Sequence, residues 1–89
     1  MMLCMNYFVY IIRCRDDSLY TGITTDLKRR IDEHNGKYEG GAKYTAGRRP
    51  VELIYSQKFN NRSEAGKEEW RIKSMKRKQK EALIKNYGK

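Results

Sequence analysis

The feature that most constrains the fold is a strand–turn–strand pattern near the N-terminus. Residues 7–13 (YFVYIIR) are rich in aromatic and β-branched side chains, which favour strands. Residues 16–18 (DDS) form turns readily, and residues 19–23 (LYTGI) resume the pattern, so the segment predicts a β-hairpin. Apolar side chains on both faces of the first strand indicate a central strand that is covered on each side. Gly22 predicts a bulge, or a point where another backbone or a ligand comes close.

A helix is predicted over residues 26–34, with Thr25 or Asp26 as its N-cap and an Asn-Gly pair as its end. Two apolar residues at i,i+4 spacing give this helix a stripe that faces the core. Arg30 and His34 form a second row, which we expect at the edge of the buried stripe. The two tyrosines of the hairpin, the guanidinium and the imidazole can therefore reach one surface.

The second half of the chain predicts one more strand and two more helical segments. Residues 51–59 alternate apolar and polar side chains, as a strand does. Asn61 can cap a helix, and Glu64 three positions later completes a capping box. The apolar stripe of this helix ends at Met75, and a third helical stretch is predicted around residues 80–86.

Size and composition predict one domain over residues 1–89, with a core at about 7–76 and a basic helical tail at 77–89. No apolar run approaches the roughly 20 residues that a membrane-spanning helix needs. The first residues lack the features of a secretory signal, so we expect a cytoplasmic protein that does not enter membranes. Cys4 and Cys14 are expected to be reduced and apolar in role, and a four-ligand zinc site is not expected.

The net charge of +9 favours binding to polyanions. Residues 36–50 predict a basic loop, with at most one short helical turn, and a connection of this length in a small domain is often functional. From Arg71 onward there are eight basic residues and one acidic residue. We therefore expect nucleic acid, DNA or RNA, as the partner, and a protein partner stays open. The predicted phosphate-binding residues are Lys37, Lys43, Arg48, Arg49, Lys73, Lys76, Arg77 and Lys78.

Taken singly, the remaining polar residues have ordinary interpretations. Tyrosines in strands usually pack, Arg30 can be solvated, His34 can complement the helix dipole, and Glu69 can pair with Lys73. Together they suit phosphodiester hydrolysis, which needs a positioned water, a proton acceptor and cationic charge on the phosphoryl oxygens. Positive charge can lower the pKa of a tyrosine so that it activates the water. Motifs of phosphate-binding loops, serine hydrolases and paired zinc sites do not occur.

The pattern resembles the GIY-YIG nuclease domain over nearly the whole chain. The residues that carry the resemblance are Val9-Tyr10, Tyr20-Thr21-Gly22, Arg30 and His34, followed by GGAKYT, by RRP before a strand, and by SEA…EEWRIK. It is closest to small single-domain bacterial members, and it is similar to the nuclease subunit of the eukaryotic enzyme that cuts branched DNA. The resemblance implies an α+β fold, a small three-stranded antiparallel sheet flanked by about three helices.

The resemblance also implies roles for individual residues. Tyr10 would be the general base or water-orienting group, and Tyr20 would assist it. Arg30 would clamp the phosphate, with His34 at the nearby histidine or tyrosine position. Glu69 would bind one divalent ion, Mg²⁺ or Mn²⁺.

Two features leave alternatives open. The first is the metal ligand, because periodicity does not separate Glu69 from the neighbouring Glu68. The second is the completeness of the active site. No asparagine occurs between residues 76 and 85, where many family members carry one after the glutamate helix. Gly22, by contrast, matches the family glycine that lets the strand pack closely.

Three functions follow from these patterns. The first is a Mg²⁺-dependent endonuclease that cuts branched or otherwise structured DNA. The second is a catalytically silent module that keeps the nuclease fold and binds nucleic acid. The third is a structural or protein-binding role. The sequence leaves the preferred DNA structure, the pathway and the oligomeric state open.

Overall fold

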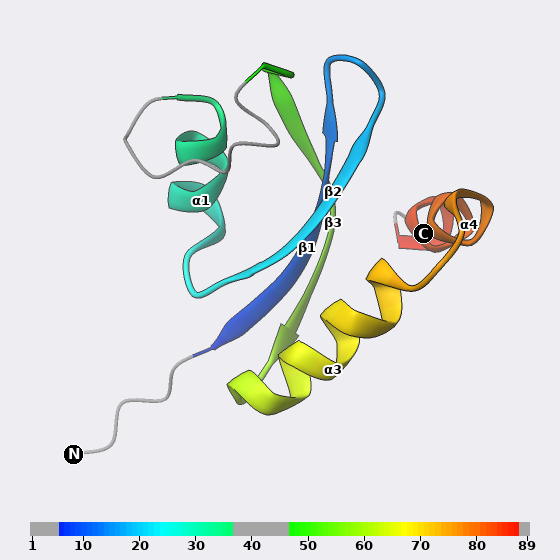
Figure 1. The fold of residues 1–89 in the computed structure, drawn as a ribbon. Coiled ribbons are helices and arrows are strands. Elements are labelled where there is room, and N and C mark those ends of the chain that lie inside the picture. Colours follow the sequence, from blue (N-terminus) through cyan, green and yellow to red (C-terminus); the bar gives the residue numbers. More distant parts are fainter. Residues whose placement is uncertain (1–5, 37–46, 88–89) are drawn as a thin grey trace.

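The central strand of the sheet is β1 (Tyr7–Cys14), and it is buried on both faces. In the computed structural model, which describes residues 6–36 and 47–87, β1 lies between β2 (Leu19–Thr24) and β3 (Val51–Phe59). Both neighbours run antiparallel to it. The predicted α+β fold with a three-stranded antiparallel sheet is therefore confirmed (Figure 1).

Helices cover the two faces of this sheet separately (Figure 1). The elements in chain order are β1, β2, α1 (Leu27–His34), β3, α3 (Arg62–Lys73) and α4 (Arg77–Tyr87). On one face, Val9 and Ile11 pack with residues of α3 and α4. On the other face, Tyr10 and Ile12 pack with residues of α1. All four strand side chains are at most 1% exposed, which confirms the predicted central strand.

The β1–β2 hairpin turns where the sequence predicts it. The Asp16 side chain accepts hydrogen bonds from the backbone N–H and the hydroxyl of Ser18, and Asp17 has a φ of 71°. Aspartate tolerates this left-handed conformation better than most residues. The irregularity in the sheet lies opposite β3, between Ile11 and Ile12, so the β1–β2 ladder is regular at Gly22. Of the two alternatives at Gly22, the bulge is thus wrong.

Helix α1 has the predicted ends. The Asp26 side chain accepts the backbone N–H of Arg29 at 3.1 Å, so Asp26 and not Thr25 is the N-cap. Asn35 is the C-cap, and Gly36 follows with a φ of 87°. The Asn35 side chain also accepts from the backbone N–H of Val51 and donates to its carbonyl, at 2.7 and 3.2 Å. These two bonds fix the end of α1 to the start of β3.

Helices α3 and α4 differ from the prediction at two boundaries. The Asn61 side chain caps α3 as expected, but the helix ends at Lys73, so Met75 packs against the core from beyond it. Helix α4 begins at Arg77, three residues before the predicted start. The Gln79 side chain accepts the backbone N–H of Lys76 at 2.9 Å, which is the glutamine half of a capping box. Without serine or threonine at the cap, the sequence signal is weak.

Helix α4 is attached to the sheet at both ends. At its start, Glu81 accepts from Arg13 of β1 at 2.9 Å and from Arg77 at 2.7 Å, and Arg77 also pairs with Asp17 at 3.2 Å. Toward its end, the Tyr87 ring lies 5.2 Å from the Tyr55 ring of β3. The segment predicted as a basic tail therefore packs on the same core as the rest of the described chain. Its treatment as a separate part of the domain stays a prediction.

Candidate active site

The Tyr10 side chain crosses from the central strand over its neighbour Gly22. The two residues are paired in the β1–β2 ladder, so their side-chain positions lie on the same face of the sheet. A Cβ atom at residue 22 would lie 2.5 Å from the Tyr10 hydroxyl oxygen and 2.8 Å from Cζ. The close approach that Gly22 predicts is therefore real, but it is made by a side chain of the protein. Glycine is required here for space.

The Tyr10 hydroxyl joins two residues of α1 in a directed chain of hydrogen bonds. Arg30 Nε donates to the Tyr10 oxygen at 3.3 Å, since a guanidinium can only donate. The Tyr10 oxygen also lies 2.9 Å from His34 Nε2. With its oxygen accepting from Arg30, the hydroxyl proton is placed to be donated to His34, which requires the neutral imidazole with its proton on Nδ1.

The environment of His34 favours this neutral form. The side chain is 0% exposed, deeper than the edge position that the sequence predicts. Burial, together with the positive charges of Arg30 and Arg49, lowers the pKa of His34 to about 4, although the Glu33 charge acts in the opposite direction. At neutral pH the imidazole is therefore uncharged and can accept the Tyr10 proton.

The pKa of Tyr10 is raised in the free protein, although Arg30 lies beside the hydroxyl. The phenol is 1% exposed, and burial raises its pKa more than the hydrogen bond and charge of Arg30 lower it. Tyr20 and Glu69 raise it further. The positive charge of Arg30 does lower this pKa, but it offsets only part of the effect of desolvation. Tyr10 is thus a neutral phenol at neutral pH.

Arg30 is held beside Tyr10 by Glu33, a residue that the sequence analysis did not single out. Burial lowers the pKa of Arg30, but hydrogen bonds to Tyr10 and Glu33 outweigh this effect and raise it. Arg30 Nη1 lies 3.0 Å from Glu33 Oε1, and Arg29 Nε lies 3.2 Å from Oε2 of the same carboxylate. The i,i+3 spacing of arginine and glutamate was the available signal. The charged guanidinium is 24% exposed, so its charge reaches the surface.

Tyr20 completes the aromatic part of the cluster. Its ring centroid lies 6.5 Å from that of Tyr10 and 5.2 Å from that of His34, within the range of aromatic contacts. Tyr20 is half-buried, while Tyr10 is fully buried. The structure therefore brings Tyr10, Tyr20, Arg30 and His34 together on the face of the sheet that α1 covers.

Glu69 and Glu68, which periodicity leaves unresolved, face different parts of the protein. The charge of Glu69 raises the pKa of Tyr10, whereas the charge of Glu68 raises that of Tyr55. Tyr55 belongs to the core on the opposite face of the sheet from Tyr10. Both oxygens of Glu68 are engaged by Arg71, at 2.8 and 2.6 Å. The ion pair of Glu69 with Lys73 involves one oxygen, at 3.1 Å.

The donor set at this site suits a magnesium-like ion held through few protein ligands. Across residues 6–36 and 47–87, no three His, Cys, Asp or Glu side chains gather into a metal-binding group. Mg²⁺ is commonly held by one or two carboxylates, with water and substrate phosphate as its other ligands. The Glu69 carboxylate is 22% exposed and could serve in this way once Lys73 is displaced. The residues present therefore fit such an ion.

Some of the predicted phosphate-binding residues are engaged by partners within the protein, and others are exposed and available to a ligand. Arg48 pairs with Asp16 at 2.9 Å, and Arg49 donates to the His34 carbonyl at 2.7 Å. Lys73 and Arg77 are also in ion pairs. Lys76 and Lys78 are exposed, and no side-chain partner is found for them within the described part of the chain. The remaining predicted residues, Lys37 and Lys43, lie outside the described residues, as does Cys4.

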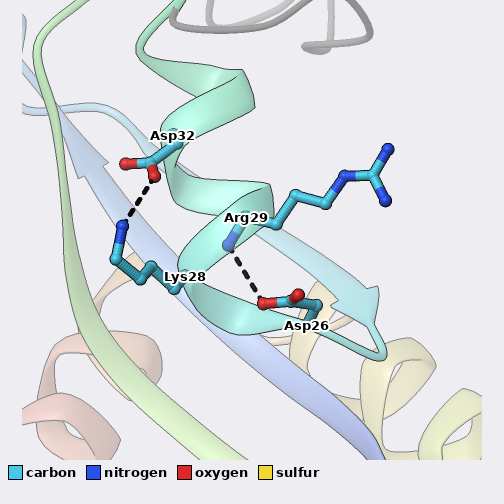
Figure 2. A pocket seen from close by; sticks show the side chains of 4 residues that line it. All are labelled: Asp26, Lys28, Arg29 and Asp32. Atoms are coloured by element: carbon cyan, nitrogen blue, oxygen red, sulfur yellow. Dashed lines mark hydrogen bonds and ion pairs between the residues drawn. The ribbon is translucent and has the colours of Figure 1, made fainter.

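A separate hollow lies along α1. Its volume is about 430 Å³, and the residues that line it are Asp26, Lys28, Arg29 and Asp32 (Figure 2). Lys28 Nζ pairs with Asp32 at 3.0 Å, and Asp26 caps the helix. None of the clustered residues around Tyr10 lines it. We therefore assign the chemistry to the cluster and not to this hollow.

Comparison with known proteins gives a family-level match. Residues 6–82 match the GIY-YIG catalytic domain. A UPF0213 protein of Desulfotalea psychrophila is 51% identical over 79 residues, which are 89% of this chain and 71% of that protein. A UPF0213 protein of Halobacterium salinarum is 52% identical over 78 residues, covering 88% of this chain and 99% of its own.

Solved structures of similar proteins share the fold. The solution NMR structure of a UPF0213 protein from Bacillus halodurans has a TM-score of 0.62 and 46% identity, covering 94% of this chain and 87% of that one. The solution NMR structure of a protein from E. faecalis has a TM-score of 0.64 and 40% identity, covering 99% and 92%. In the described segments, moreover, no helix has both the length and the apolar character needed to span a bilayer.

Proposed function

This chain belongs to the GIY-YIG family, and we propose that it is an endonuclease that hydrolyses phosphodiester bonds with one Mg²⁺ or Mn²⁺ ion. The proposed substrate is branched or otherwise structured DNA, and RNA stays an alternative. The observation that supports activity best is the chain of hydrogen bonds from Arg30 through the Tyr10 hydroxyl to His34. A cytoplasmic location stays a prediction from the sequence.

The hydrogen-bonded chain gives Tyr10 a way to accept a proton without becoming a phenolate. A water bound next to the hydroxyl would transfer its proton to the Tyr10 oxygen while the Tyr10 proton moves to His34 Nε2. The second of these transfers joins two groups that lie 2.9 Å apart, within the hydrogen-bond reach that general-base catalysis requires. The lowered pKa of His34 makes this route costly in the free protein, because the imidazole ends protonated. Charge brought by substrate and metal has to offset that cost.

Arg30 and Glu69 would supply the electrostatic part of the reaction. The Arg30 guanidinium carries permanent charge beside the Tyr10 hydroxyl and would bind a non-bridging phosphoryl oxygen. Glu69 would hold the divalent ion, which supplies Lewis-acid stabilisation of the phosphoryl and leaving oxygens when bound. Arg71 engages both oxygens of Glu68, whereas Lys73 engages one oxygen of Glu69, and this difference supports the assignment of Glu69 over Glu68.

The test compares matched pairs of variants in a cleavage assay on labelled branched and linear DNA, with Mg²⁺ or with chelator. We expect Glu69→Gln to abolish cleavage while Glu68→Gln retains it, since Arg71 engages both oxygens of Glu68 whereas Lys73 engages one oxygen of Glu69. We expect Tyr10→Phe to abolish cleavage while Tyr55→Phe, which removes a hydroxyl from the opposite face, retains it. DNA binding should persist in all four variants.

Two results would contradict the proposal. Loss of activity in Glu68→Gln but not in Glu69→Gln would show that the ligand assignment is wrong. If the wild-type protein instead binds DNA in a salt-sensitive way and cuts no substrate with metal present, the protein is a catalytically silent nucleic-acid-binding module. Such a module would keep the same basic surface and the same buried cluster.

A further inference from the structure

The chain's one tryptophan lies at the surface next to Glu69. Trp70 of α3 is 73% exposed, whereas the other exposed large apolar residues, Leu53 and Tyr87, are 37% and 49% exposed. The Tyr87 ring rests against Tyr55. In the described structure, no ring contact or side-chain hydrogen bond is found for the indole of Trp70. A large aromatic surface is therefore left in water.

The surroundings of Trp70 on α3 keep its ring accessible. Residue i−4 of Trp70 on α3 is Gly66, in the turn toward which helical side chains generally lean. A Cβ atom at Gly66 would have one described neighbour within 4 Å, Arg62 Nη1 at 3.0 Å. Glycine inside a helix costs roughly 1 kcal/mol relative to alanine. Here it places no side chain between Arg62 and Trp70, which lie four positions before and after it on α3.

The charges around Trp70 favour a polyanionic ligand. Lys67 and Lys73 occupy the i−3 and i+3 positions, which are helix-surface neighbours of residue 70. Protein-binding surfaces are enriched in tryptophan and arginine but depleted in lysine. A tryptophan with lysines at i−3 and i+3, of which Lys73 also pairs with Glu69, in a chain of net charge +9, fits nucleic acid better.

We propose that Trp70 is a nucleobase-stacking residue that binds an unpaired nucleotide of the substrate. In an intact duplex the faces of the bases are stacked on each other, so an exposed indole can reach a base face only at a single-stranded segment, bulge, flap or strand end. The placement of this nucleotide near the cleaved bond rests on the proposed nuclease function, whereas the stacking itself does not. Trp70 directly follows Glu69 on α3, where consecutive side chains diverge by about 100° around the helix, so the stacked base would lie on the face beside the Glu69 carboxylate.

A binding experiment without metal tests the stacking separately from cleavage. Trp70 is the chain's one tryptophan, so indole emission reports on this position alone. With chelator present, we expect oligothymidylate to quench the emission at saturation. An oligomer of equal length and charge with abasic sites should bind more weakly and quench little. Equal quenching by both oligomers, or none by oligothymidylate at saturation, would overturn the proposal.

Variants measured by anisotropy with labelled oligothymidylate give a second readout. Trp70→Ala should weaken binding by roughly 5- to 100-fold, as loss of one aromatic stack does, while Trp70→Phe should recover much of it. The salt dependence of the affinity should be unchanged in Trp70→Ala, because the indole contacts no phosphate. In Lys67→Ala, the matched charge variant, the slope should fall by about 0.7 for a lost phosphate contact. Leu53→Ala should behave like wild type.

The outcomes separate this inference from the proposed function. If bases stack on Trp70 but no substrate is cleaved, the stacking role is supported, the proposed nuclease activity is contradicted, and the protein is a nucleic-acid-binding module. If the protein cleaves DNA but wild type and Trp70→Ala bind the oligonucleotide equally well, the stacking role is contradicted and the nuclease activity is supported. A shift of the indole emission with protein concentration alone, together with self-association that Trp70→Ala abolishes, would make this face a protein interface and overturn the inference.

Discussion

The Tyr10 hydroxyl oxygen and His34 Nε2 lie 2.9 Å apart, although 24 residues separate them in the chain. Their hydrogen bond joins the central strand to the last turn of α1. Because His34 is 0% exposed, the bond gives a buried polar group a hydrogen-bond partner within the protein. The same pair links the stability of the protein to pH.

We expect the stability to fall between about pH 6.5 and pH 4. His34 has a pKa of about 4 in the folded state, against about 6.5 in an unfolded chain. The unfolded state therefore binds a proton first as the pH falls, so stability rises with pH in this window. From pH 7.5 to pH 5 the free energy of unfolding should drop by about 2 kcal/mol. Urea denaturation at several pH values measures it.

His34→Gln provides the control for this prediction. The chain contains one histidine, so the variant removes the imidazole titration altogether. Its stability should be lower but nearly constant from pH 7.5 to pH 5. Glu81, whose pKa is lowered to about 2 mainly by its hydrogen bond to Arg13, contributes below pH 4.5 in both proteins. An equal slope in wild type and His34→Gln between pH 7.5 and pH 5 would contradict the prediction.

Gly22→Ala should destabilise the protein more than Gly47→Ala does. A Cβ atom at residue 22 would lie 2.5 Å from the Tyr10 hydroxyl oxygen, and the buried ring has little room to move. We expect a loss of about 1–3 kcal/mol, the usual range for overpacking, together with reduced cleavage. At Gly47 the described structure has no atom within 4 Å of such a Cβ, so this substitution should be nearly neutral. If the two variants unfolded at the same urea concentration, the proposed steric requirement for glycine at residue 22 would be refuted.

Substitution of Arg77 and of Lys78 should have different effects: Arg77→Ala should lower folding stability, and Lys78→Ala should lower the salt dependence of DNA affinity. Arg77 pairs with Glu81 and Asp17, so Arg77→Ala should lower stability by roughly 0.5 kcal/mol, a typical value for exposed ion pairs. It should change the salt dependence of duplex binding little. Lys78→Ala should leave stability unchanged and reduce the slope of log affinity against log salt by about 0.9 if Lys78 contacts a phosphate. A larger slope change in Arg77→Ala would show that DNA displaces the ion pairs.

The sequence by itself determined the order and type of the elements. Local signals were sufficient where a residue's conformational preference and its hydrogen-bonding capacity agree, as in the Asp16–Ser18 turn, the Asp26 and Asn61 caps, and strand β3 (Val51–Phe59). The boundary of α4 was missed because its cap uses the Gln79 side chain. The residues around Tyr10 were found from the resemblance of spaced motifs, since each of them has an ordinary local interpretation.

Tertiary structure alone decided how these residues act on one another. The depth of His34 and the direction of the Tyr10 pKa shift depend on which side chains exclude water, and that is set by packing between segments distant in the chain. The different surroundings of Glu69 and Glu68 depend on how α3 lies against the sheet, which a helical period leaves undetermined within one residue. The exposure of Trp70 has the same origin. Sequence patterns specify faces of elements, and only the packed fold specifies what each face meets.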